Sequence, residues 1–348
     1  MRNLSYSSKG YTVSEIKSRL RKIYEEEIEP YKDIVEFFPF TIVEYYMSPI
    51  FKERLVLLHL SVEEIVKPFK CIGYHARNDN IIIFIRKKKI KNIYDLPMFI
   101  KALYHELKHH KQLMANKNSK TKNLDTIRYD IETFIRQNDY EHYDINYDGY
   151  YFEMEAELYA LNKSLKYLKE NGLLSDNLRC QYEKERELIL FRMYNFHMHP
   201  FLKRVHEIMQ MEFIEAPSWL NAFYNEDGTF KTVGEILNSY HIEEDVLNMF
   251  FSSEDFLNSI DFSLLTIEQQ NIIINALQAS YNSDIERYKN NFKFLKGGII
   301  TQKMVLKANS EITKRLAYYS KKLEEFKRLM EIPIMNCNLD EETQDKRR

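Results

Sequence analysis

The chain has 348 residues, of which 44% are hydrophobic and 29% are charged, a balance typical of a soluble globular protein with a large core or two domains. Its formal net charge of −2 excludes a global positive field that would attract nucleic acid or anionic lipid. Because only 8 glycines and 8 prolines interrupt this length, long helices are favoured over a turn-rich β fold.

The cysteines and the first residues bear on the cellular compartment. Cys71, Cys180 and Cys337 are far apart, so they indicate neither a disulfide framework nor a cysteine-rich zinc knuckle. The opening MRNLSYSSKGYTVSE lacks the apolar core of a signal peptide, and no stretch approaches the ~20 apolar residues that span a bilayer. We therefore expect a cytoplasmic protein that has reduced thiols and no membrane segment.

The N-terminal part of the chain mixes helix and strand patterns. Apolar residues at helical spacing predict a helix over residues 12–36. The segment 36–48 is rich in β-branched and aromatic residues and predicts one strand, and NIIIFIRK at 80–87 predicts another. This half of the chain is therefore expected to combine a small sheet with helices.

A long amphipathic helix is predicted over residues 96–113. Asp95 is suited to cap its start, and Pro97 fits its first turn. Its apolar residues recur at helical spacing and form one stripe: Leu96, Phe99, Ile100, Leu103 and Leu107. His105 and His109 lie on the opposite side of the helix, so we expect them to face a cleft beside it.

The rest of the chain is predicted to be almost purely helical. A polar loop over 115–124 precedes a short helix at 125–137, and another helix begins near Tyr150. Further helices are predicted at 176–213, 233–252, 254–259, 267–292 and 308–331. The charged end of the chain, residues 336–348, is predicted to be a disordered tail.

The predicted helix at 96–113 carries the sequence ALYHELKHHKQL, in which His105, Glu106 and His109 form an H-E-x-x-H pattern. Histidines at i and i+4 share one helix face and can bind one Zn²⁺ together. The adjacent glutamate can take a proton from zinc-activated water and return it to a leaving amine. Chance alone produces about 0.03 such patterns in a chain of this composition. The alternative is a solvent-facing charged helix, which the neighbouring lysines also suit.

Glu153 on the next long helix supplies a candidate third ligand. A catalytic zinc needs three protein ligands and an open fourth position, and Glu153 would complete a His₂Glu set. Glu157, one turn later, could accept the free N–H of a zinc-bound histidine and fix its tautomer. The small residues Ala156 and Ala160 favour close approach of the two helices. The alternative is a surface cluster of glutamates.

HELKH followed on a later helix by E-x-x-A-E resembles the gluzincin metallopeptidases, above all the minigluzincins and the ImmA/IrrE-like group. The resemblance covers roughly residues 60–170. It implies that His105, His109 and Glu153 bind zinc, that Glu106 is the general base, and that an extended peptide pairs with an edge strand over 80–86. Glu157 stands where that group has Asp or Asn. Candidates for stabilising the oxyanion are His142, Tyr143, Tyr147, Tyr150 and Tyr151.

These observations predict an α+β fold in three parts. A zincin-like metallopeptidase domain over 1–172, with a small sheet, precedes a helical domain over 173–335 and the tail over 336–348. The expected function is zinc-dependent hydrolysis of a protein or peptide substrate, with Glu106 as base and the helical domain selecting the substrate. One alternative is a non-catalytic or regulatory zinc protein that binds a partner through its helical region. Another is a helical scaffold without metal.

Overall fold

The computed structural model describes residues 13–28, 41–44, 73–75, 81–85, 95–118, 123–139, 149–211, 219–239 and 242–331. The chain divides into two compact units. The first runs to His197 without 122–124 and includes Gly297–Thr301, and the second takes the remainder. The sequence-based division began a second domain at 173, whereas here the residues from 173 to 197 belong to the first unit. The predicted tail over 336–348 lies outside the described residues.

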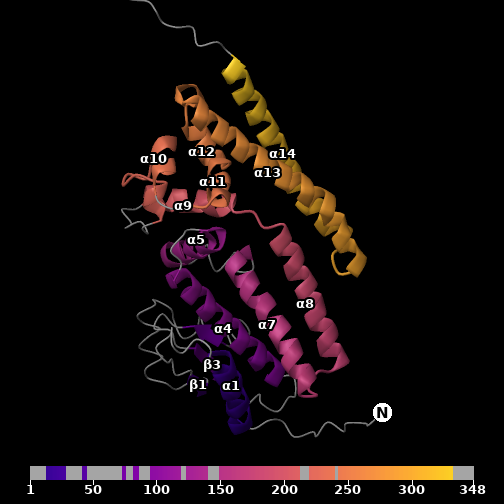
Figure 1. Ribbon diagram of the computed structural model, residues 1–348. Coiled ribbons are helices and arrows are strands. Elements are labelled where there is room, and N and C mark those ends of the chain that lie inside the picture. The colour runs from indigo at the N-terminus through magenta and orange to yellow at the C-terminus, as the bar shows by residue number, and fades with distance from the viewer. Residues whose placement is uncertain are drawn as a thin grey trace, which may run out of the picture. The chain divides into compact units, whose positions relative to one another are not determined.

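Helices dominate the first unit (Figure 1). They are α1 (Val13–Ile28), α4 (Asp95–Asn118), α5 (Leu124–Asn138), α7 (Tyr151–Glu170) and α8 (Asp176–Tyr194). α7 packs against both α4 and α8, and α1 packs against α4. The stripe predicted on α4 is confirmed, because every one of its five apolar side chains is buried. α4 also continues five residues beyond the predicted end at 113, into the segment that was expected to be a loop.

A carboxylate from α5 sets the start of α7. The buried side chain of Glu132 accepts hydrogen bonds from the backbone N–H groups of Tyr151, at 2.7 Å, and Phe152, at 2.9 Å. Negative charge is favourable at a helix N-terminus, where backbone donors have no partner within the helix. Burial raises the pKa of Glu132 well above its usual range, although both backbone hydrogen bonds oppose this shift. Glu132 thereby anchors the turn of α7 that carries Glu153.

A small sheet accompanies these helices. Its strands are β1 (Thr41–Glu44), β2 (Gly73–His75) and β3 (Ile81–Ile85), in the order β1-β3-β2. β3 pairs in parallel with β1, from Thr41 opposite Ile82, and antiparallel with β2. The expectation that 80–86 is an edge strand is therefore wrong, because β3 has neighbours on both sides and offers no free edge to a peptide.

The predicted α+β class, with a zincin-like domain, is also wrong, because helices account for nearly all of the ordered structure that the model describes. The strands have only four, three and five residues. The β-branched segments at 36–48 and 80–87 carry apolar patterns of strand length only. The long helices extend over 15 to 30 residues, so an amphipathic stripe can continue over several turns of each.

Among its described residues, the regular elements of the second unit are helices, and an isolated β-bridge joins Tyr224 and Phe230. Its α helices are α9 (His199–Met211), α10 (Val233–Asn238), α11 (Glu244–Phe251), α12 (Glu254–Ser259), α13 (Ile267–Asn291) and α14 (Gln302–Glu331). Short 3₁₀ turns are η3 (Leu220–Ala222), η4 (Phe262–Leu264) and η5 (Phe292–Gly297), the last of which ends in the first unit. The long helices α13 and α14 pack along one another (Figure 1).

Two of the predicted helices are each divided in the structure. The segment 176–213 breaks between α8 and α9, where Pro200 supplies no backbone N–H and suits a helix start. The segment 233–252 breaks between α10 and α11. α10 begins with a capping box in which Thr232 and Glu235 bond reciprocally. No helix among the described residues is long and apolar enough to cross a membrane.

Candidate metal centre

Three side chains from α4 and α7 converge within the first unit: His105, His109 and Glu153. The two Nε2 atoms are 2.9 Å apart. Glu153 Oε2 lies 3.1 Å from Nε2 of His109 and 3.3 Å from Nε2 of His105. Four ligands at ~2.0–2.1 Å from a tetrahedral zinc are about 3.3 Å from one another, so this triangle has the size of one face of a zinc site. His105, His109 and Glu153, the three zinc ligands predicted from the sequence, therefore lie together in the structure.

The helices place these atoms by simple geometry. The i, i+4 spacing puts both histidines on one face of α4, and the first turn of α7 presents Glu153 to them. Ala156 and Ala160 of α7 are fully buried, consistent with close packing of the two helices. The histidines were expected to face a cleft but instead face α7, where His109 is 9% exposed and Glu153 4%.

Glu157 holds the far side of the His105 ring. Its Oε2 lies 3.2 Å from Nδ1 of His105, so a proton on Nδ1 is donated to the carboxylate. Burial alone would raise the pKa of Glu157, but the hydrogen bond from His105 and the charge of Lys101 lower it to about 2. This is the contact that the sequence analysis assigned to Glu157.

Gln112 performs the same task for His109. Its Oε1 lies 3.0 Å from Nδ1 of His109, while its Nε2 donates to the Phe152 carbonyl at 3.1 Å and to Glu155 at 2.7 Å. Because both neighbours of Nε2 are acceptors, the amide has one orientation, and Oε1 must accept from Nδ1–H. The sequence analysis missed Gln112, although its position three residues after His109 on the same helix was an available signal.

The two outer hydrogen bonds determine what the inner atoms can do. With a proton on each Nδ1, the two neutral rings direct lone pairs from Nε2 towards the Glu153 carboxylate. Three acceptors within 3.3 Å repel one another unless a cation lies among them. That cation is either a metal ion or a proton added to one of the rings, so the arrangement is built to attract positive charge.

The pKa shifts around the triangle have the same origin. Burial alone would lower the pKa of His105, but hydrogen bonds to Glu153 and Glu157 and the charge of Glu106 raise it to about 10. Burial alone would raise the pKa of Glu153, but the two histidines hold it well below its usual range. Glu106 is 8% exposed, and its negative charge is one of the causes that raise the pKa of His105.

The candidates for oxyanion stabilisation are only partly described. His142, Tyr143 and Tyr147 lie outside the described residues. Tyr150 is fully buried at the start of α7. Tyr151 stacks beneath the guanidinium of Arg128, whose Cζ is 4.3 Å from the centre of the ring. The tyrosine nearest to Glu153 in sequence is therefore engaged by a cation from α5.

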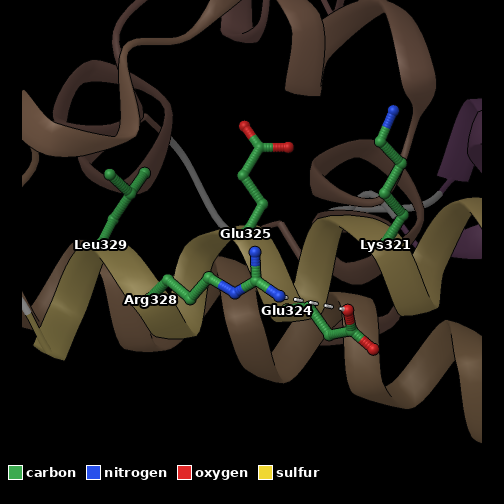
Figure 2. Close-up of a pocket in the computed structure, with 5 residues that line it drawn as sticks. All are labelled: Lys321, Glu324, Glu325, Arg328 and Leu329. Carbon is green, nitrogen blue, oxygen red and sulfur yellow. Dashed lines mark ion pairs between the residues drawn. The ribbon is translucent and has the colours of Figure 1, made fainter.

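The second unit contains a surface depression of about 370 Å³ on α14 (Figure 2). All five lining side chains rise from this one helix: Lys321, Glu324, Glu325, Arg328 and Leu329. Arg328 pairs with Glu324 at 4.0 Å, and both side chains are largely exposed. Such i, i+4 pairs are ordinary on helix surfaces and contribute little, so this depression has none of the converging chemistry of the triangle.

No protein-family model, curated protein or solved structure matches the chain.

Proposed function

We propose that the chain is a zinc-dependent hydrolase of peptide bonds, with His105, His109 and Glu153 as ligands and Glu106 as general base. The observation that carries the proposal is the convergence of two Nε2 atoms and one carboxylate oxygen within 3.3 Å. Two imidazoles and one carboxylate form a donor set that suits zinc and leaves a fourth position for water or substrate.

Each protein group has a defined task in this proposal. Zinc, when bound, supplies Lewis acidity that makes water a nucleophile at neutral pH. Glu106 takes a proton from the attacking water and returns it to the leaving amine, a role that its place beside His105 on α4 supports. Glu157 and Gln112 hold the Nδ1 protons of the two histidines. A cytoplasmic protein or peptide is the expected substrate.

A non-catalytic zinc protein is the second candidate, and the burial of the site favours it. Glu106, His109 and Glu153 are all under 10% exposed, whereas a catalytic centre must admit its substrate. In this alternative the metal stabilises the contact between α4 and α7, and helical surfaces bind a partner. Glu106 then has no chemical task, which separates the two candidates experimentally.

The first experiment is elemental analysis of the purified wild type, Glu153→Gln and Glu170→Gln. Glu170 is an exposed glutamate at the end of α7 and serves as the matched control. We expect one zinc per chain in the wild type and the control, and loss of zinc in Glu153→Gln. Absence of zinc from wild-type protein prepared without chelator, together with no uptake of added zinc, would contradict the proposal.

The second experiment uses Glu106→Gln in a screen for peptide cleavage. This variant preserves the size and shape of the side chain, so zinc content and folding should match the wild type. The loss of the base should lower the rate of cleavage by roughly 10²–10⁴-fold. A zinc-loaded wild type that cleaves no more than the variant would point to the non-catalytic candidate.

A further inference from the structure

A chain of ionic contacts connects α8 to the candidate metal centre. It starts at Nδ1 of His105, which faces Oε2 of Glu157 at 3.2 Å. The other oxygen of Glu157 is paired with the ammonium group of Lys101. The same ammonium lies 2.9 Å from a carboxylate oxygen of Glu185, on α8. The two oxygens of Glu157 therefore contact different partners, His105 and Lys101. The Lys101 ammonium is shared between Glu157 and Glu185.

α8 holds Lys101 by more than one contact. The ring of Tyr182 lies 5.7 Å from the Lys101 ammonium, and the Tyr182 hydroxyl donates to the carbonyl of Pro97 at 3.2 Å. Gln181 donates to the second oxygen of Glu185 at 3.1 Å. Burial alone would lower the pKa of Lys101, but Glu157 and Glu185 raise it, so the side chain stays a cation. The ammonium is thus held by α8 on one side and by Glu157 of α7 on the other.

We propose that Lys101 and Glu185 are positioning residues of the metal centre, which hold Glu157 in the one orientation that keeps a proton on Nδ1 of His105 and directs Nε2 to the metal. This inference rests on the proposed zinc site. Without the ammonium, the Glu157 carboxylate is left close to the negative charges of Glu153 and Glu185, and repulsion turns it away from the ring. His105 then loses the partner that fixes its tautomer.

The two histidines differ in a way that makes the inference specific. The partner of His109 is the neutral amide of Gln112, whose contacts are with Phe152 and Glu155 and do not include Lys101. Removing the Lys101 charge should therefore disturb Nδ1 of His105 more than Nδ1 of His109. A general loss of helix packing would disturb both rings, so the pair of histidines distinguishes positioning from a merely structural role.

The test compares Lys101→Met and Glu185→Gln with two matched controls, Lys166→Met on α7 and Glu183→Gln on α8, which change exposed side chains. Zinc affinity is measured by competition with a chromophoric chelator, and the imidazole nitrogens are followed by long-range ¹H–¹⁵N NMR. We expect Lys101→Met to weaken zinc binding about 10–100-fold and Glu185→Gln to weaken it less. The Nδ1 resonance of His105 should shift more than that of His109, and Lys101→Arg should recover part of the affinity.

The outcomes separate this inference from the proposed function. If the wild type binds zinc and both variants bind it within twofold, with unchanged His105 resonances, the positioning role is wrong and the metal centre stands. If the wild type takes up no zinc, both are wrong. Circular dichroism of the metal-free variants checks folding, and the near-isosteric Glu185→Gln keeps the test decisive if Lys101→Met does not fold.

Discussion

Each unit contains a cluster of buried polar side chains, and these two clusters are built in opposite ways. In the second unit, Asp284 is 2% exposed and accepts two hydrogen bonds from Arg315, at 2.7 and 2.9 Å. Asn291 donates to Asn309 at 2.8 Å, so α13 and α14 are joined by complementary groups. In the first unit, the triangle of His105, His109 and Glu153 instead brings acceptors together.

The difference concerns the contribution of each cluster to the free energy of folding. A buried polar group that meets a complementary partner strengthens the packing around it, whereas acceptors facing one another raise the free energy of the folded state until a cation joins them. Departures of this kind are expected at functional sites, because the rest of the fold must hold them in place. The comparison therefore supports the α4–α7 contact as the candidate functional site.

The largest expected effect comes from breaking a complementary pair in the second unit. Arg315→Met leaves the buried Asp284 carboxylate with only the longer contact to Arg287 at 3.5 Å. The free energy of unfolding should fall by about 3–5 kcal/mol, because a buried charge loses its partner. Trp219, the single tryptophan of the chain, is buried in this unit, so its fluorescence during urea unfolding gives the measurement. The double variant Asp284→Asn/Arg315→Met should recover much of the lost unfolding free energy, because no buried charge is then left unpaired. A loss below ~1 kcal/mol in Arg315→Met alone would contradict the contrast between the units.

Zinc should stabilise the first unit and leave the second unchanged. At free zinc of 100 times the dissociation constant, binding to the folded state alone adds about 2.7 kcal/mol. Hydrogen exchange should therefore slow for amides of α4 and α7 but not for those of α13 and α14. Glu153→Gln should show no dependence on zinc. If zinc slowed hydrogen exchange equally in both units, the two units would unfold together. That result would contradict the contrast between them.

Acid should weaken the second unit through His199. Burial lowers the pKa of His199 to about 4, against the hydrogen bond to the Met249 carbonyl at 3.0 Å; Arg315 lowers it further and Asp284 raises it. The unfolded chain takes up this proton near its ordinary value of 6.5, so stability is complete above that pH and falls as pH drops towards 4. We expect a loss of about 2 kcal/mol over this interval by Trp219 fluorescence. His199→Gln should lack that part of the pH dependence; an identical acid profile in this variant would show that other groups cause it.

The smallest effect is expected from Glu27 in the first unit. This α1 carboxylate contacts Lys111 at 2.7 Å, Lys163 at 2.6 Å and the Tyr159 hydroxyl at 2.7 Å, so it joins α1 to α4 and α7. Burial alone would raise its pKa, but these three partners lower it to about 2. Its contribution is therefore present above pH 4.5 and disappears as pH falls to about 2.

The corresponding variant is Glu27→Gln, which should cost about 1 kcal/mol at neutral pH and flatten the acid profile below pH 4.5. Hydrogen exchange of α1 amides provides the measurement. Glu26→Gln is the matched control, because Glu26 makes only an exposed i, i+4 pair with Lys22 at 3.6 Å among the ion pairs described for it. A similar loss of stability in both variants would show that the contacts of Glu27 with α4 and α7 contribute no more than a surface charge does.

Local patterns in the sequence were sufficient to predict α4 and to nominate the three candidate ligands that the structure brings together. A stripe of period 3.6 predicted α4, and the i, i+4 spacing placed His105 and His109 on one face, because both depend on residues within a few turns. The position of Glu153 on a second helix followed from the same kind of pattern together with a family resemblance. The interruption between α8 and α9 was missed because apolar residues continue across it in the sequence.

Hydrophobic periodicity could not predict the contacts between segments that are distant in the sequence. Three contacts depend on which surfaces pack together. β3 lies between β1 and β2, Glu132 anchors the start of α7, and Lys101 contacts Glu185. The residues that hold the histidines, Gln112 and Glu157, acquire their function only when α7 lies against α4. Helix formation depends on neighbours along the chain, whereas the chemistry of this site depends on neighbours in space, and folding is what makes them neighbours.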